Sequence, residues 1–207
     1  MPGRLILLRH GEKGDGFRLC STGLARSLAL AQTYLGKNAG HSLFDGDEPA
    51  AFFALTPHTI ETVSPSAASW GLPVRAYSLG MLSGSAKELA MNLRTREAAA
   101  DLLRSKWDGK TVVVVWEHKR IASDELEKQY PEEKVTLRQL LGLASVGVPD
   151  KWEGENYNYF WIVNFGKNGA PSEFRCLKQD YRGKHPDLPD NDWGKPADPP
   201  AGADCQS

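Results

Sequence analysis

One stretch near the start of the chain decides the fold: Leu5-Ile6-Leu7-Leu8-Arg9-His10-Gly11-Glu12-Lys13. Four consecutive aliphatic residues predict a short strand that is buried on both faces. The polar residues after it predict a turn, and Gly11 allows the backbone to turn tightly or to approach a ligand closely. A histidine between an arginine and a lysine is suited to holding an oxyanion beside a nucleophile. The stretch therefore predicts both a strand of the core and the beginning of a functional site.

The composition is that of an ordinary globular domain. The 207 residues are 41% hydrophobic and 25% charged, with a formal net charge of -1. Because there is no broad basic field, nucleic acid is not an expected partner, and no apolar run approaches the roughly 20 residues of a membrane helix. We expect one domain over residues 1–181, followed by a loosely ordered tail rich in proline and glycine over residues 182–207. The oligomeric state is left open.

The cysteines give an expectation about the cellular setting. Cys20, Cys176 and Cys205 are odd in number and widely spaced, a pattern that fits neither a disulfide framework nor a zinc motif. The sequence therefore predicts free thiols without a catalytic role, in a reducing, cytoplasmic setting.

Strand and helix patterns alternate along the chain. Strands are expected at residues 5–8, 50–55, 74–77 and 111–116, with two further candidates at 157–165 and 173–177. Helices are expected at 21–35, 60–70 and 85–106, from 118 to about 130, and at 136–144. In the first helix, Leu24, Leu28, Ala31 and Leu35 recur at helical spacing and are expected to be buried. This order predicts a three-layer α/β domain with a mostly parallel central sheet.

Three histidines directly follow predicted strands: His10, His58 and His118. If those strands are parallel, all three side chains reach the same edge of the sheet, where α/β domains bind ligands. Arg9, Lys13 and Lys119 come with them. The sequence thus predicts a cationic site with more than one imidazole.

Phosphoryl transfer fits this set of residues best. A neutral imidazole attacks phosphorus well near neutral pH, which assigns His10 as the nucleophile. Arg9 can grip two phosphoryl oxygens at once, and a protonated His118 can stabilise the developing charge. Lys13, His58 and Lys119 are further candidates for binding phosphate. A carboxylic acid must protonate the leaving alcohol, and Glu12, Glu88 and Glu117 remain open for that role.

The order of the motifs resembles a known family. Four segments carry the resemblance: Leu7–Glu12, Leu19–Arg26, Glu61–Val63 with Pro65, and Val113–His118. Together they look like the histidine phosphatase superfamily with its phosphoglycerate mutase-like fold, over about residues 4–165. The Trp-Glu-His form of the last segment, followed by Lys119, is similar to a small bacterial branch of that superfamily.

The resemblance implies a phosphomonoester hydrolase that acts on a phosphorylated small molecule without a cofactor. His10 would become the phosphohistidine, and Arg9 and His118 would form part of the phosphate pocket. The family usually has a second arginine shortly before the Glu-Thr pair, whereas residues 56–62 contain none and His58 lies nearest to that position. This departure leaves open an alternative, a phosphate-binding or regulatory protein with a weakened site. A mutase that moves a phosphoryl group between two positions belongs to the first class.

A metal site is the remaining alternative. Three imidazoles, from His10, His58 and His118, suit zinc. The neighbouring cations would repel a divalent ion, so no metal is expected.

Overall fold

The computed structural model describes residues 1–207 except 81, 182, 196–203 and 206–207. Its strands are β1 (Arg4–Arg9), β2 (Pro49–Ala54), β3 (Val74–Ala76), β4 (Thr111–Trp116), β5 (Tyr159–Phe165) and β6 (Pro171–Lys178). Its α-helices are α1 (Ser21–Leu30), α2 (Pro57–Ser69), α3 (Gly84–Leu102), α4 (His118–Ile121), α5 (Asp124–Gln129) and α6 (Leu137–Leu140). Short π-helical or 3-10 turns cover Ala31–Leu35, Ser105–Trp107 and Leu143–Val146.

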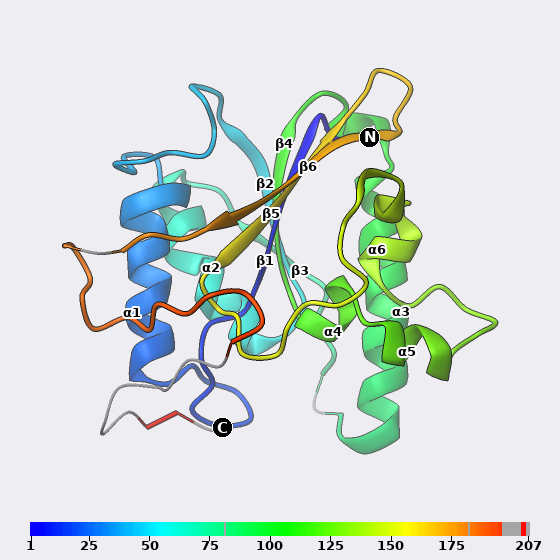
Figure 1. The fold of residues 1–207 in the computed structure, drawn as a ribbon, viewed down its shortest axis with the longest axis horizontal. Helices are drawn as coiled ribbons and strands as arrows, with labels where there is room; N and C mark the ends of the chain where they lie inside the picture. Colours follow the sequence, from blue (N-terminus) through cyan, green and yellow to red (C-terminus); the bar gives the residue numbers. More distant parts are fainter. Residues whose placement is uncertain (81, 182, 196–203, 206–207) are drawn as a thin grey trace.

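The strands form one sheet in the order β3-β2-β4-β1-β5-β6. β3, β2, β4 and β1 pair in parallel, whereas β5 and β6 add an antiparallel edge. Helices α1 and α2 lie on one side of this sheet, and α3 to α6 lie on the other (Figure 1). The predicted three-layer α/β domain with a mostly parallel sheet is therefore confirmed.

Alternate residues of β1 serve the two halves of the core. Leu5 and Leu7 belong to the cluster that packs under α3, α4 and α6, whereas Ile6 and Leu8 belong to the cluster under α1 and α2. Neighbouring side chains of a strand point to opposite faces, so a strand between two helical layers must be apolar throughout. This requirement explains the uninterrupted aliphatic run.

Helix α1 differs from the expected pattern. Leu24 and Leu28 are about half exposed, at 48% and 53%, and the buried face instead contains Arg26, Ser27 and Leu30. The expectation that both leucines are buried was wrong because polar residues of this helix have partners inside the fold. Those partners, described below, compensate the cost of burying the polar groups.

Helix α2 tolerates a proline through one such contact. The helix begins at Pro57, earlier than expected, and Pro65 therefore lies in its interior. Pro65 has no N–H to donate to the carbonyl of Glu61. The Ser27 hydroxyl of α1 donates to that carbonyl at 2.9 Å. A side chain of the neighbouring helix thus replaces the missing backbone hydrogen bond.

The chain after β6 has a defined place on the domain where it is described. The Trp193 ring packs against Trp152 and Trp161, and the Asn158 amide donates to the carbonyl of Asn191 at 3.1 Å. Composition alone predicted a loose tail over residues 182–207, but these contacts lie within it. The same expectation for residues 182, 196–203 and 206–207 lies outside the described residues.

The cysteine prediction requires a correction. Cys20, at the start of α1, forms a disulfide with Cys205, while Cys176 is free and exposed. Spacing along the sequence did not reveal this pair because the fold brings together residues that are 185 positions apart. The expected cytoplasmic setting depended on three free thiols, so this disulfide removes its basis.

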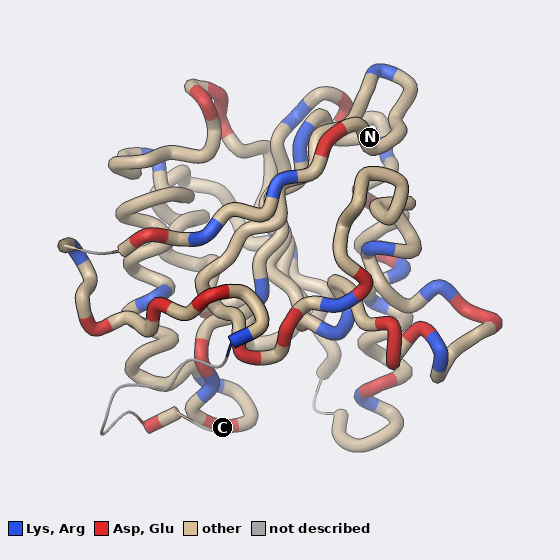
Figure 2. Tube along the Cα trace, viewed as in Figure 1, with Lys and Arg blue, Asp and Glu red and all other residues tan. Residues whose placement is uncertain are grey.

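Charge is spread over the molecule. Basic and acidic positions are interspersed along the described chain trace (Figure 2), in keeping with the formal net charge of -1. Within the described ranges, none of the helices combines the length and apolar character needed to cross a membrane.

Candidate active site

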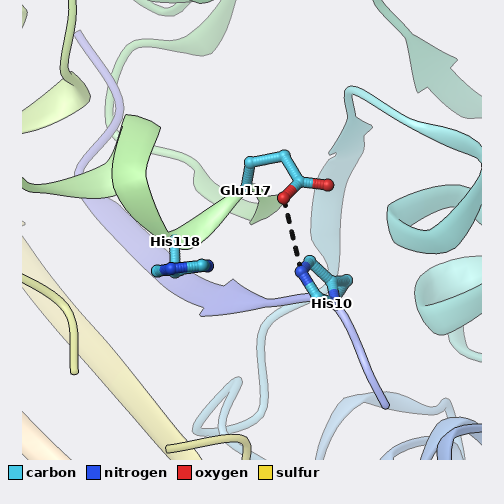
Figure 3. Close-up of side chains that lie close together, drawn as sticks. All are labelled: His10, Glu117 and His118. Atoms are coloured by element: carbon cyan, nitrogen blue, oxygen red, sulfur yellow. Dashed lines mark ion pairs between the residues drawn. The ribbon is translucent and has the colours of Figure 1, made fainter. Parts of the chain in front are cut away.

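The register between β1 and β4 creates the site. Arg9 pairs with Trp116 at the carboxyl ends of these strands, so the next residues, His10 and Glu117, emerge side by side. β4 ends at Trp116, Glu117 caps α4 and His118 is its first residue. The backbone has therefore already turned, and Glu117 and His118 face the same region as His10 (Figure 3).

His10 is fixed in one orientation. Its ring is 1% exposed, and Nδ1 lies 2.7 Å from the carbonyl oxygen of Gly11. Because a carbonyl only accepts, Nδ1 carries the proton and Nε2 has the lone pair in the neutral ring. Burial lowers the pKa of His10, an effect that the nearby Glu117 carboxylate only partly offsets. The free protein thus presents a neutral imidazole with an available Nε2.

Glu117 lies closest to that nitrogen. Its Oε2 is 3.4 Å from His10 Nε2, its Oε1 accepts a 3.1 Å hydrogen bond from the Thr56 hydroxyl, and Lys13 Nζ is 3.3 Å from Oε2. Burial by itself raises the pKa of Glu117, but the cationic surroundings, Lys13 among them, hold this pKa well below its ordinary value. Glu117 is therefore an ionised carboxylate beside the candidate nucleophile.

Arg9 supplies a buried cation with unmatched donors. The guanidinium carbon lies 3.8 Å above the ring centroid of Tyr157. Nε and Nη1 are buried and have no hydrogen-bond partner among the described residues. Burial lowers the pKa of Arg9, yet an arginine stays charged at neutral pH. Buried charged donors without acceptors are costly, so this group is suited to receive an anion.

His118 is a neutral second imidazole in the free protein. Burial and the charge of Arg9 lower the pKa of His118 to about 2. The sequence predicted a protonated ring, but the fold places this ring too close to other cations and too far from water. Its Nδ1 is buried and has no partner within the described part of the chain. An entering phosphate dianion would raise its pKa and restore the predicted cation.

His58 completes a cluster of three rings. Its centroid lies 5.9 Å from that of His10, and the centroid of His118 lies 6.4 Å from His10 on another side. His58 Nε2 lies 2.8 Å from the carbonyl oxygen of Asp15, and burial lowers the pKa of the ring. His58, which lies nearest to the position of the missing arginine, is thus present at the site. Its Nε2 is already bonded to the loop that contains Asp15.

The turn after His10 is held tightly by its surroundings. The Gly11 N–H donates to the Thr62 hydroxyl at 2.8 Å. A Cβ at Gly23 would lie only 2.2 Å from the carbonyl oxygen of Glu12, so α1 approaches the turn where only glycine fits. These contacts position the backbone that orients His10.

The other predicted residues lie in different places. Glu12 is buried in an ion pair with Arg26, with 2.6 Å between Oε1 and Nη2. Its carboxylate is therefore engaged and does not serve as the general acid. Glu88 pairs with Arg120 at 2.5 Å. Lys119 is about half exposed and lies 3.7 Å from Glu125. Of the three carboxylates that the sequence left open, Glu117 is the one that the structure brings to His10.

Two contributors were missed by the sequence analysis. Tyr157 stacks on Arg9, and the Thr56 hydroxyl donates to Glu117. Tyr157 lies about 40 residues from the nearest expected site residue. No local pattern marks such a contact, which arises only when β5 pairs with β1.

The structure also changes the metal candidate. One ligand atom each from His10, Glu117 and His118 lies within 4.8 Å of the others, so Glu117 takes the place expected for His58. Lys13 lies against the same carboxylate, and Arg9 lowers the pKa of His118 through its charge. These cations oppose a divalent ion, and the donor set fits an anion better.

Comparisons with known proteins give only distant likenesses. No protein-family model matches the chain, and no curated protein sequence does either. A mycobacterial glucosyl-3-phosphoglycerate phosphatase complexed with VO3 is 17% identical, covering 86% of this chain and 99% of that chain with a TM-score of 0.48. A candidate alpha-ribazole-5'-P phosphatase from Escherichia coli is 13% identical, covering 86% and 97% with a TM-score of 0.48. A candidate phosphohistidine phosphatase SixA from Agrobacterium tumefaciens is 14% identical, covering 87% and 97% with a TM-score of 0.39.

Each of these three solved structures is described as a phosphatase. The substrates named for these proteins do not carry over to this chain.

Proposed function

We propose that the protein is a phosphomonoester hydrolase that transfers the phosphoryl group to His10. The main support is the orientation of His10, whose Nδ1 is tied to the Gly11 carbonyl oxygen at 2.7 Å. This contact leaves the Nε2 lone pair free beside the unmatched donors of Arg9. A nucleophile beside buried cationic donors is the arrangement that phosphoryl transfer requires.

The reaction has two steps. First, the Nε2 lone pair of His10 attacks phosphorus, the bond to the ester oxygen breaks and the alcohol leaves with a proton. Second, water attacks the phosphohistidine, the P–N bond breaks and inorganic phosphate leaves. Arg9 and His118 bind the phosphoryl oxygens in both steps, and Arg9 stabilises the charge that develops on them.

A trapped intermediate tests this proposal. Mixing the protein with an aryl phosphate labelled on phosphorus and quenching within milliseconds should yield protein-bound label that is lost in acid and retained in alkali, as expected for a phosphoramidate. The label should map to the peptide that contains His10. Steady hydrolysis without any such label, or with label on another residue, would contradict the proposal.

Glu117 is the carboxylate that we assign to proton transfer. It lies 3.4 Å from His10 Nε2, within reach of an ester oxygen on the attacked phosphorus. The pKa of Glu117 is low in the free protein. A phosphate dianion between the two side chains would raise it, because like charges disfavour the ionised form. Binding of the substrate would thus make Glu117 an acid for the first step. The carboxylate that remains after proton transfer would then act as the base for the second step.

Replacement of Glu117 by glutamine should separate its role in proton transfer from the effect of its negative charge on anion binding. The kcat for an alkyl phosphate should fall about 10²–10³-fold because the alkoxide then leaves without a proton. The kcat for p-nitrophenyl phosphate should fall much less, because its phenolate needs none. Vanadate should bind more tightly because a negative charge beside the pocket is removed. Rates on both esters with Glu117→Gln, and vanadate inhibition, measure all three.

Glu97→Gln is the matched control, since Glu97 pairs with Arg94 and lies outside the site and its neighbouring cavity. It should change neither rate appreciably. An equal loss of both rates in Glu117→Gln would show that Glu117 only positions its neighbours.

A phosphate-binding protein with a weakened site is the second candidate function. It is favoured by the engagement of His58 with Asp15 and by the occupation of Lys13 by Glu117. Both contacts leave Arg9 with less support in binding phosphate than a second arginine would give. Protein that binds vanadate but hydrolyses nothing across a broad panel of phosphoesters would support this candidate and exclude the first.

A further inference from the structure

A cavity of about 350 Å³ adjoins the candidate site. Glu117 and His118 belong to its lining, and the first turns of α3 together with α4 and α5 supply most of the remaining walls. A space of this size accommodates a small molecule. A phosphoester held at His10 would therefore direct its leaving portion into a walled space rather than into solvent.

The charged residues of this cavity do not balance. It is lined by the cations Lys13, Lys87, Lys119 and Arg120 and by the carboxylates Glu88, Glu117 and Glu125. Lys13 pairs with Glu117 at 3.3 Å, and Arg120 pairs with Glu88 at 2.5 Å. The Lys119–Glu125 pair is long, at 3.7 Å, and both side chains are largely exposed, so water screens it.

Lys87 is the cation without a counterion. It lies on the first turn of α3, is partly buried and has no ion-pair partner among the residues that the structure describes. A lysine usually packs its aliphatic stem against the protein surface and keeps its ammonium accessible. The cavity thus has phosphoryl chemistry at one end and an unmatched positive charge on its lining.

We propose that the substrate is a phosphomonoester whose leaving portion carries a second acidic group, a carboxylate or a second phosphate, and that Lys87 binds this group. The inference rests on the proposed function for the position of the phosphoryl group. Lys119 assists, because its exposed pair with Glu125 opens at little cost. The apolar side chains of Met91 and Leu126 in the same lining accommodate the carbon skeleton between the two acidic groups.

The test uses binding of non-hydrolysable ligands, so its result does not depend on turnover. Phenylphosphonate is compared with its 3-carboxy and 4-carboxy derivatives by calorimetry on the full chain. At least one carboxylated ligand should bind about tenfold more tightly, the value of one charge-assisted hydrogen bond. Lys87→Gln should abolish this preference and leave the affinity for phenylphosphonate unchanged. The preference should also weaken as salt is added.

Lys110→Gln is the control, because Lys110 precedes β4 at the opposite end of the sheet and lies outside the cavity. It should retain the full preference. Equal binding of all three ligands by the unaltered protein, or a preference that survives in Lys87→Gln, would overturn the inference. Neither outcome affects the proposed function, which stands or fails on hydrolysis and on the label at His10.

Discussion

Replacement of His10 by alanine is expected to abolish phosphomonoester hydrolysis, with a loss of about 10⁴-fold or more in kcat. The loss follows from the chemistry, because no other described side chain places a lone pair where Nε2 of His10 lies. His118 is also neutral, but its pKa of about 2 reflects burial and the charge of Arg9, and it makes a poorer nucleophile. Rates with p-nitrophenyl phosphate measure the loss, since that ester does not need an acid.

Two further measurements make this result decisive. The His10→Ala variant should still bind vanadate or phosphate, because Arg9 and His118 remain, although a covalent label should no longer form. Replacement of His41, an exposed loop residue, should leave the rate unchanged. A His10→Ala variant that keeps its thermal transition and still hydrolyses the ester would refute the nucleophile.

Replacement of Arg26 by methionine is expected to lower the free energy of unfolding by about 3–5 kcal/mol. Arg26 and Glu12 are 1% and 5% exposed, and two guanidinium nitrogens bond to the carboxylate at 2.6–3.1 Å. Methionine keeps much of the volume but leaves a carboxylate buried without a counterion. Urea unfolding at neutral pH measures the change.

The pH dependence identifies the cause of that loss. Burial raises the pKa of Glu12, but the charge and hydrogen bonds of Arg26 outweigh it and bring the pKa below its ordinary 4.5. The native pair therefore stabilises the fold above that value and loses its contribution as the pH falls through the lowered pKa. In Arg26→Met the charge and hydrogen bonds of Arg26 no longer oppose the effect of burial, so Glu12 should take up a proton at higher pH. The gap between the two proteins should consequently shrink from pH 8 to pH 5.

Two comparisons control this experiment. Arg104→Met removes an exposed arginine that lies 3.5 Å from Asp101, and it should cost less than about 1 kcal/mol. Adding Glu12→Gln to Arg26→Met should recover part of the lost stability. A deficit of Arg26→Met that is constant with pH would point to lost packing instead of an unpaired charge.

Much of the fold follows from the sequence because strand burial is a local property. The run Thr111–Trp116 predicts its strand with the correct bounds, and the aliphatic run after Arg4 predicts the neighbouring one. Parallel pairing then brings His10 and His118 to one edge, as expected. The same reasoning could not determine how far the chain has turned at Glu117, which decides whether that carboxylate shares the site.

The failures come from contacts between distant segments. Leu24 and Leu28 have the spacing of a buried stripe. Helix α1 nevertheless buries Arg26 and Ser27, because these side chains bond to Glu12 and to the Glu61 carbonyl inside the fold. The disulfide between Cys20 and Cys205 likewise joins two segments that are far apart in the sequence. Hydrophobicity and spacing do not encode such partners, since each is defined only when two remote stretches have already packed.

The Cys20–Cys205 bond has a practical consequence for handling the protein. It closes almost the entire chain into a covalent ring, because the joined residues are 185 positions apart. A protease that cuts once anywhere inside this ring releases no fragment until a reductant is added. Nicked molecules would therefore keep the full mass of the chain on a non-reducing denaturing gel, and only the reduced sample would release two fragments.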